Sequence, residues 1–186
     1  NINFNGKNIS LIGDDRETTI IDGSSASTVV RFHNSENEET ILSGFTIRNG
    51  YGYQQGTGFD ENCDYPYCGG GITIHNSSPT IDNCVISNNS SSRGGGILFC
   101  ETGSSNSKIK NSIISFNSAS TEGGGIAVMG SNSPIIENSI ISYNTATFND
   151  VNSNGGGIYI NGSPTIHHCQ LNNNSSARGG AICIQH

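Results

Sequence analysis

The sequence predicts an all-β solenoid of about seven coils, each made of three short strands. The first observation is a glycine-rich tag followed by isoleucine, which recurs five times. Its isoleucines are Ile72, Ile97, Ile126, Ile158 and Ile182, so the period varies only between 24 and 32 residues. The second observation is that apolar residues alternate over short runs, while no useful length of chain shows helical spacing. A fixed motif at a slightly variable period is typical of stacked coils joined by loops of different length.

The strands before the first tag are less regular than those after it. We expect short strands within 9–13 and 19–23, and a degenerate copy of the repeat at 41–49. Each later coil contains a second segment that contributes two more strands, and these segments align as 79–89, 107–117, 134–144 and 164–174. The whole chain, 1–186, is therefore interpreted as one domain, expected to be part of a longer protein.

Alternation assigns an inward-facing column to each strand of the coil. Because paired strands lie about 4.8 Å apart, like side chains on successive coils should stack into a continuous core. The expected inward residues are Ile81, Ile109, Ile136 and Ile166 in one column; Phe45/Ile47, Cys84/Ile86, Ser112/Ile114, Ser139/Ile141 and Cys169/Leu171 in the next; and Ile72/Ile74, Ile97/Phe99, Ile126/Val128, Ile158/Ile160 and Ile182/Ile184 in the third.

Two columns of asparagine are expected at turns. The first should form a structural ladder in which side-chain amides hydrogen-bond along the solenoid axis, and it comprises Asn89, Asn117, Asn144 and Asn174. The second is expected to form another such ladder, and it comprises Asn83, Asn111 and Asn138 and ends in His168. Both columns are interpreted as structural rather than catalytic.

With these repeats, the chain resembles right-handed parallel β-helix proteins of the pectin-lyase-like superfamily. More narrowly, it resembles secreted and surface proteins with Gly-Gly-Ala-Ile repeats, including polymorphic outer-membrane adhesins. Those proteins carry a Phe-x-x-Asn element before the glycine tag, and the matching elements here are 86–89, 114–117, 141–144 and 171–174, with an aliphatic residue in place of Phe. The resemblance implies a right-handed parallel β-helix, but the fold hosts lyases, hydrolases, adhesins and structural spikes alike.

The composition limits the classes of partner. The formal net charge of −7 argues against nucleic acid and against an anionic membrane as partners. Only 12% of the residues are charged and 25 are glycine, which suits a thin core stacked along one axis. No apolar run is long enough to insert into a membrane.

Charged residues on the outward columns alternate in sign from coil to coil. One such column contains Asp82, Lys110, Glu137 and His167, and in another Arg93 is followed by Glu122. Alternation pairs opposite charges across neighbouring strands, whereas the resemblance implies that a lyase would cluster carboxylates around Ca²⁺ beside a Lys or Arg base. We therefore predict no catalytic residue, no metal ligand and no cofactor. Calcium is compatible with the sequence but is not implied by it.

Two insertions, 50–68 and 146–154, interrupt the regular coils and should project from one edge of the solenoid. The long insertion carries aromatic and acidic residues that form the candidate ligand-binding set: Tyr51, Tyr53, Phe59, Asp60, Glu61, Asp64, Tyr65 and Tyr67. Exposed aromatics beside carboxylates suit stacking on sugar rings or contact with a protein. The alternative is that the tyrosines cover the flank of the solenoid as a packed loop.

The six cysteines fall into three groups. Cys63 and Cys68 enclose a tight turn and are predicted to form a disulfide. Cys84 and Cys169 share one inward column but lie three coils, or about 14 Å, apart, which is too far for a disulfide. Cys100 and Cys183 have no evident partner in the sequence.

The expected function is non-catalytic binding, adhesion or spacing by a secreted or cell-surface β-helix, with a glycan or a surface protein as partner. One alternative is a polysaccharide lyase or glycoside hydrolase of the pectin-lyase-like superfamily. The other is a structural filament that assembles end to end through open solenoid ends, because uncovered edge strands invite stacking.

Overall fold

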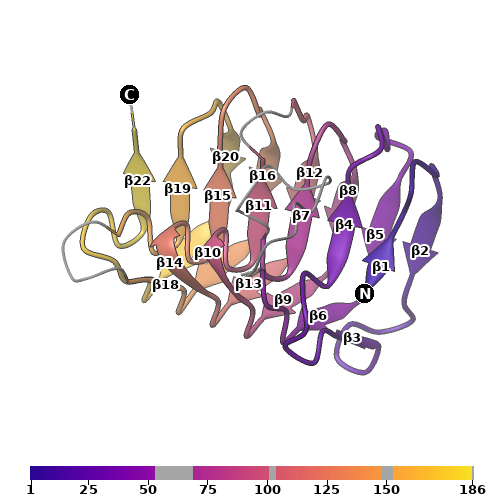
Figure 1. The fold of residues 1–186 in the computed structure, drawn as a ribbon, viewed down its shortest axis with the longest axis horizontal. Helices are drawn as coiled ribbons and strands as arrows, with labels where there is room; N and C mark the ends of the chain where they lie inside the picture. The colour runs from indigo at the N-terminus through magenta and orange to yellow at the C-terminus, as the bar shows by residue number, and fades with distance from the viewer. Residues whose placement is uncertain (53–68, 101–103, 148–152, 186) are drawn as a thin grey trace, which may run out of the picture.

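The computed structural model describes residues 1–52, 69–100, 104–147 and 153–185. The chain winds into a solenoid whose short strands stack along the long axis of the molecule, from the N-terminus at one end to β22 at the other (Figure 1). All pairings between named strands are parallel, and each strand pairs with its counterparts in the coils before and after it. The predicted all-β parallel solenoid is thus confirmed.

The strands form four sheets, named here in the order in which the chain visits them. Sheet A contains β1 (Ile2–Asn3), β4 (Val30–Phe32), β7 (Ile72–Ile74), β11 (Ile97–Phe99), β15 (Ile126–Val128), β19 (Ile158–Ile160) and β22 (Ile182–Ile184). Sheet B contains β2 (Ser10–Ile12), β5 (Ile41–Ser43), β8 (Thr80–Asp82), β12 (Lys108–Lys110), β16 (Ile135–Glu137) and β20 (Thr165–His167).

Sheet C contains β3 (Ile20–Asp22), β6 (Thr46–Arg48), β9 (Val85–Ser87), β13 (Ile113–Ser115), β17 (Ile140–Ser142) and β21 (Gln170–Asn172). Sheet D contains β10 (Ser90–Arg93), β14 (Ser118–Glu122) and β18 (Thr145–Ala146). Since sheets B and C hold six strands each and sheet A seven, the described chain completes six turns and begins a seventh.

Sheet D differs from the expected three strands per coil. The sequence places a Ser-rich or Thr-rich turn between each ladder asparagine and the next glycine tag, and serine has little intrinsic preference for strands. In the third to fifth coils these turns nevertheless pair in register, with Ser90 opposite Ser118 and Ser118 opposite Thr145. The stacking of whole coils brings these segments together, so tertiary context overrides the weak local preference.

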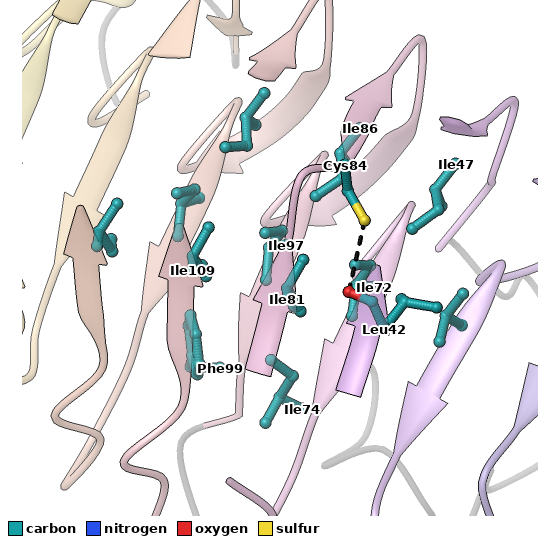
Figure 2. Close-up of a cluster of buried hydrophobic side chains, with 14 of the residues drawn as sticks. Leu42, Ile47, Ile72, Ile74, Ile81, Cys84, Ile86, Ile97, Phe99 and Ile109 are labelled. Atoms are coloured by element: carbon teal, nitrogen blue, oxygen red, sulfur yellow. Dashed lines mark hydrogen bonds between the residues drawn. The ribbon is translucent and has the colours of Figure 1, made fainter. Parts of the chain in front are cut away.

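The core lies inside the coil, where the predicted inward columns are buried. Aliphatic columns run from coil to coil along the inner faces of sheets A, B and C (Figure 2). The pairing register places like residues side by side, as with Ile81, Ile109 and Ile136 of sheet B. Towards the C-terminal end the columns become less buried, and Ile184 is exposed. The interior columns were therefore predicted correctly, with the last coil as the exception.

Cys84 occupies an inward position as a thiol, as predicted. Its Sγ lies 3.6 Å from the carbonyl oxygen of Leu42 on the preceding coil (Figure 2), and burial raises the pKa of the thiol to about 11. The thiol therefore stays protonated and unreactive at neutral pH. Cys169, further along the same column, is also a free thiol and is half-buried.

A second apolar cluster lies outside the main core. It lies on the outward side of sheet A and in the turns beyond it. Its buried residues are Leu98, Cys100, Ala127, Met129 and Tyr159, and the partly buried Cys183 packs against them. Cys100 and Cys183, for which the sequence indicated no disulfide partner, thus both contribute to this cluster.

The glycine tags are required by the turn from sheet D back to sheet A. Gly94 has a φ of 60°, and a Cβ atom there would collide with the backbone of Ile97 and Leu98. At Gly95 a Cβ would collide with the carbonyl oxygens of Ser118 and Gly124 on the next coil. Only glycine lets the chain approach its neighbour this closely.

The described residues include no helix long and apolar enough to cross a membrane.

Candidate functional site

Most of the predicted ligand-binding residues cannot be placed. The residues that lie outside the described part of the chain are Tyr53, Phe59, Asp60, Glu61, Asp64, Tyr65 and Tyr67. The predicted disulfide, Cys63 and Cys68, also lies outside it. Tyr51 is described and is 41% exposed. Its backbone pairs with Ser90 of β10, so it extends the line of sheet D by one coil. The described start of the second insertion, Ala146, lies in β18 of the same sheet.

The first asparagine column is a hydrogen-bonded ladder at the corner between sheets C and D. Asn89 Nδ2 donates to Asn117 Oδ1 at 3.0 Å, Asn117 Nδ2 to Asn144 Oδ1 at 3.0 Å, and Asn144 Nδ2 to Asn174 Oδ1 at 3.1 Å. Each Oδ1 also accepts the backbone N–H of the preceding rung at 3.0 Å. Since Asn89, Asn117 and Asn144 are buried, the ladder fixes the backbone of this corner.

The second asparagine column is not a ladder, so this prediction was wrong. Asn83, Asn111, Asn138 and His168 are exposed residues with φ between 49° and 53°. The turn between sheets B and C needs one residue in the left-handed region, which asparagine tolerates better than most residues. In that conformation the side chain points into solvent, and Asn111 Nδ2 donates to Asp82 Oδ1 at 2.8 Å.

The alternating charges pair across coils as predicted. Lys110 Nζ lies 3.5 Å from Asp82 Oδ2, and His167 Nε2 lies 3.3 Å from Glu137 Oε2. On sheet D, Arg93 Nε lies 2.6 Å from Glu122 Oε2. Within the described residues no group of three or more His, Cys, Asp or Glu side chains could hold a metal ion.

An exposed aromatic pair stands at the corner between sheets C and D. The rings of Phe116 and Tyr143 are stacked, with centroids 5.0 Å apart and planes 6° from parallel. They are among the most exposed large hydrophobic side chains described, at 57% and 50%. Their φ angles are 55° and 56°, a left-handed conformation that costs a residue with a bulky side chain about 1–2 kcal/mol.

A groove of about 300 Å³ runs along the outside of sheet D. Its lining is almost entirely hydroxyl-bearing, and comprises Tyr51, Ser90, Ser91, Ser118, Ala119, Ser120 and Thr147. Ser118 Oγ donates to Ser90 Oγ at 3.1 Å, so hydroxyls of adjacent coils form a connected row. The groove therefore offers many donors and acceptors and one aromatic ring at its edge.

The aromatic pair lies close in sequence to residues that line the groove. Phe116 is separated from Ser118 by a single ladder residue, so their Cα atoms lie within about 7 Å of each other. The intervening Asn117 side chain points inward into the ladder, whereas Phe116 is exposed and Ser118 is half-buried. We call this surface, formed by the groove-lining residues with Phe116 and Tyr143, the corner site.

The corner site carries no formal charge in the described residues. The stretches 85–92, 113–121 and 140–147, which form this part of sheets C and D, contain no Asp, Glu, Lys, Arg or His. Two cations at its borders are paired, since Arg93 contacts Glu122 and Arg48 Nε lies 2.9 Å from Asp22 Oδ2. Its chemistry is thus that of hydroxyls, amides and aromatic rings.

Phe116 and Tyr143 were not among the predicted site residues, which all lie in the long insertion. A signal was nevertheless present in the aligned repeats. The position directly before each ladder asparagine reads Asn88, Phe116, Tyr143 and Asn173, so two coils replace a turn-forming residue with an aromatic one. Only the structure shows that the two rings touch and that a groove lies beside them.

Comparison with known proteins agrees with this architecture. Residues 3–186 match the family model described as a right handed beta helix region. No significant match was found among curated proteins or among solved structures. On the strength of the family match and of the parallel coils, the chain belongs to the right-handed β-helix family.

Proposed function

We propose that this β-helix is a non-catalytic binding module that holds a glycan at the corner site, as part of a secreted or cell-surface protein. The observation that carries the proposal is the combination of a hydroxyl-lined groove with an exposed aromatic stack on a rigid corner. The C–H face of a sugar ring packs on an aromatic face, while its hydroxyls exchange hydrogen bonds with side-chain hydroxyls and amides. Both kinds of contact are available at neighbouring positions of one corner.

The rigidity of the corner supports binding by a preformed surface. The asparagine ladder and the strand pairing of sheet D hold the groove wall in place. A preformed site loses little conformational entropy when a ligand binds, so weak individual contacts can add up to a useful affinity. The secreted or cell-surface location rests on the resemblance to surface proteins with Gly-Gly-Ala-Ile repeats.

The distribution of titratable groups favours binding over catalysis. Hydrolysis of glycosides uses two carboxylates that flank the scissile bond. Glu122 and Asp82, both carboxylates of outward columns, are each paired with a cation of a neighbouring coil. The chemistry of the corner site suits recognition of a sugar.

The proposal is tested by screening the purified chain on a glycan array and measuring any hit by calorimetry. The double variant Phe116→Asn with Tyr143→Asn should bind at least about tenfold more weakly, because it removes both rings and installs the residue that other coils carry there. Thr165→Ala with Lys108→Ala is the matched control, since both residues are exposed on sheet B and should leave binding unchanged.

A parallel assay for unsaturated or shortened sugar products covers the enzymatic alternative. Binding without product formation supports the proposal. Product formation from any glycan in the panel, or equal binding by the double variant, would overturn it.

A further inference from the structure

We propose that the corner site takes a neutral glycan, and that a flat, equatorially substituted hexopyranose stacks on an outer face of the Phe116–Tyr143 pair. This inference rests on the proposed function and names its ligand class. Three observations support it: the geometry of the stack, its placement in strained turns, and the charge of the surrounding surface.

The geometry leaves one face of each ring available. The two rings are stacked, with centroids 5.0 Å apart and near-parallel planes, so each covers only one face of the other. In the order of the coils, the residue beyond Phe116 at this turn is Asn88, and the residue beyond Tyr143 is Asn173. Both asparagines have short, exposed side chains, which leave the outer part of the aromatic faces open.

The placement of the rings is not explained by the needs of the turn. The same turn on neighbouring coils is made by Asn49, Asn88 and Asn173, all with φ between 54° and 56°. Asparagine meets the conformational requirement at lower cost than phenylalanine or tyrosine. Bulky residues kept in a strained conformation, where a less strained residue fits, are typical of functional sites.

The charge of the surface selects among glycans. An acidic polysaccharide would find no cation in the stretches 85–92, 113–121 and 140–147. Arg48 and Arg93 at the borders already contact Asp22 and Glu122, and the chain as a whole carries a net charge of −7, which repels an anion. A neutral sugar meets only groups with which it can exchange hydrogen bonds.

The amides beside the stack complete the recognition. Asn88 and Asn173 lie at the same turn on the coils before and after the stack. Asn88 Nδ2 donates to Ser87 Oγ at 3.4 Å, which leaves its second amide hydrogen and its Oδ1 for a ring hydroxyl, and Asn173 offers the same kinds of group. A sugar with equatorial hydroxyls presents a flat C–H face to the aromatic ring and directs its hydroxyls sideways, towards these amides and the serine row of the groove.

The test compares a neutral cello-oligosaccharide with an oligogalacturonide of equal length by calorimetry at low and high salt. We expect the neutral ligand to bind with an affinity that salt leaves nearly unchanged, because no ion pair forms. Phe116→Asn with Tyr143→Asn should weaken it at least about tenfold, and thermal unfolding of the double variant should show that it is folded. Asn88→Lys should then gain salt-sensitive affinity for the acidic ligand, because it sets a cation beside the stack.

The outcomes separate this inference from the proposed function. Preference for the acidic ligand would overturn the inference but leave glycan binding as the function. Equal binding of the neutral ligand by the wild type and the double variant would overturn both the inference and the proposed site. Failure to bind any glycan of the panel would remove both.

Discussion

Two corners of the solenoid make the same backbone turn with different residues. At the corner between sheets B and C, the left-handed position holds Asn83, Asn111, Asn138 and His168. At the corner between sheets C and D, it holds Asn49, Asn88, Phe116, Tyr143 and Asn173. The first corner shows that a small or polar residue is sufficient for the turn. The aromatic residues at the second corner therefore need an explanation outside the turn itself.

The corners also differ in what lies behind them. Behind the corner between sheets C and D runs the buried ladder of Asn89, Asn117 and Asn144, whereas no amide ladder connects the asparagines at the other corner. A rigid backbone with an exposed aromatic pair is a suitable base for a binding site. Four variants distinguish the contributions of the ladder, of a buried carboxylate between sheets A and B, of the stack and of the turn, from the largest expected effect to the smallest.

The largest effect is expected from removing one rung of the ladder. Asn117→Ala deletes a donor to Asn144 Oδ1 and to Ile86 O, and an acceptor for the backbone N–H and the amide of Asn89. The backbone N–H of Asn89 is then buried without its acceptor, and Asn144 Oδ1 keeps only the bond from the backbone N–H of position 117. We therefore expect a loss of about 3 kcal/mol in the free energy of unfolding. Urea denaturation measures it.

Asn111→Ala is the matched control for the ladder variant, because Asn111 is an exposed asparagine on the same coil. It should cost less than about 1 kcal/mol, mainly through the lost tolerance of the left-handed conformation. Equal losses for the two variants would show that the ladder adds nothing beyond the turn.

The second effect concerns a charged equivalent of the ladder between sheets A and B. Glu36, which is 1% exposed, accepts hydrogen bonds from Gly6 N–H at 2.8 Å, Asn34 N–H at 2.9 Å and Ser77 Oγ at 2.7 Å, and so ties three coils together. Glu36→Gln replaces one carboxylate oxygen, which accepts hydrogen bonds, with an amide NH₂ group that faces other donors. We expect it to lower the free energy of unfolding by about 2 kcal/mol.

This contribution should depend on pH in a defined direction. Burial raises the pKa of Glu36, but the hydrogen bonds from Ser77, Gly6 and Asn34 outweigh it and hold the pKa below its ordinary value of 4.5. The stabilisation is therefore complete above the unfolded-state pKa and is lost as the pH falls through the lower folded-state value. Urea denaturation near neutrality and in acid should show wild type and Glu36→Gln converging below about pH 4.5; a gap that widens in acid would contradict this.

The repeat pattern was sufficient to predict the fold and most of the core, because each coil reuses the same inward positions. It also located the ladder residues, since Asn89, Asn117 and Asn144 recur at one place in the repeat. The repeat pattern did not distinguish the buried asparagine column from the exposed one, because both columns recur with the same period. Asn111 has a positive φ and an exposed side chain, and neither property can be read from the period. Sheet D and the contact between Phe116 and Tyr143 arise from coil stacking, which local sequence does not encode.

The third effect tests the stack by removing it. Phe116→Asn with Tyr143→Asn relieves the strain of two bulky residues but loses their mutual stacking, which contributes about 0.5–1.5 kcal/mol. The free energy of unfolding should thus change by less than about 1 kcal/mol, while glycan affinity falls about tenfold, equivalent to about 1.4 kcal/mol. Thermal unfolding and calorimetry on the same samples provide both values, and a large loss of stability with unchanged affinity would assign the stack a structural role.

The smallest effect is expected from moving the stack to the other corner. Asn111→Phe with Asn138→Phe places two aromatic residues in the left-handed position of adjacent coils, beside Lys110 and Glu137 instead of the serine row. The strain of two bulky residues, at about 1 kcal/mol each, exceeds what one stacking contact returns, so the variant should lose about 1 kcal/mol in urea denaturation. In a background that also carries Phe116→Asn and Tyr143→Asn, it should not restore glycan binding, because the serine-lined groove lies along sheet D and not beside the new pair. If the transplanted pair instead stabilised the chain, aromatic stacking would be a general way to fasten these coils, and the contrast between the two corners would no longer point to a ligand.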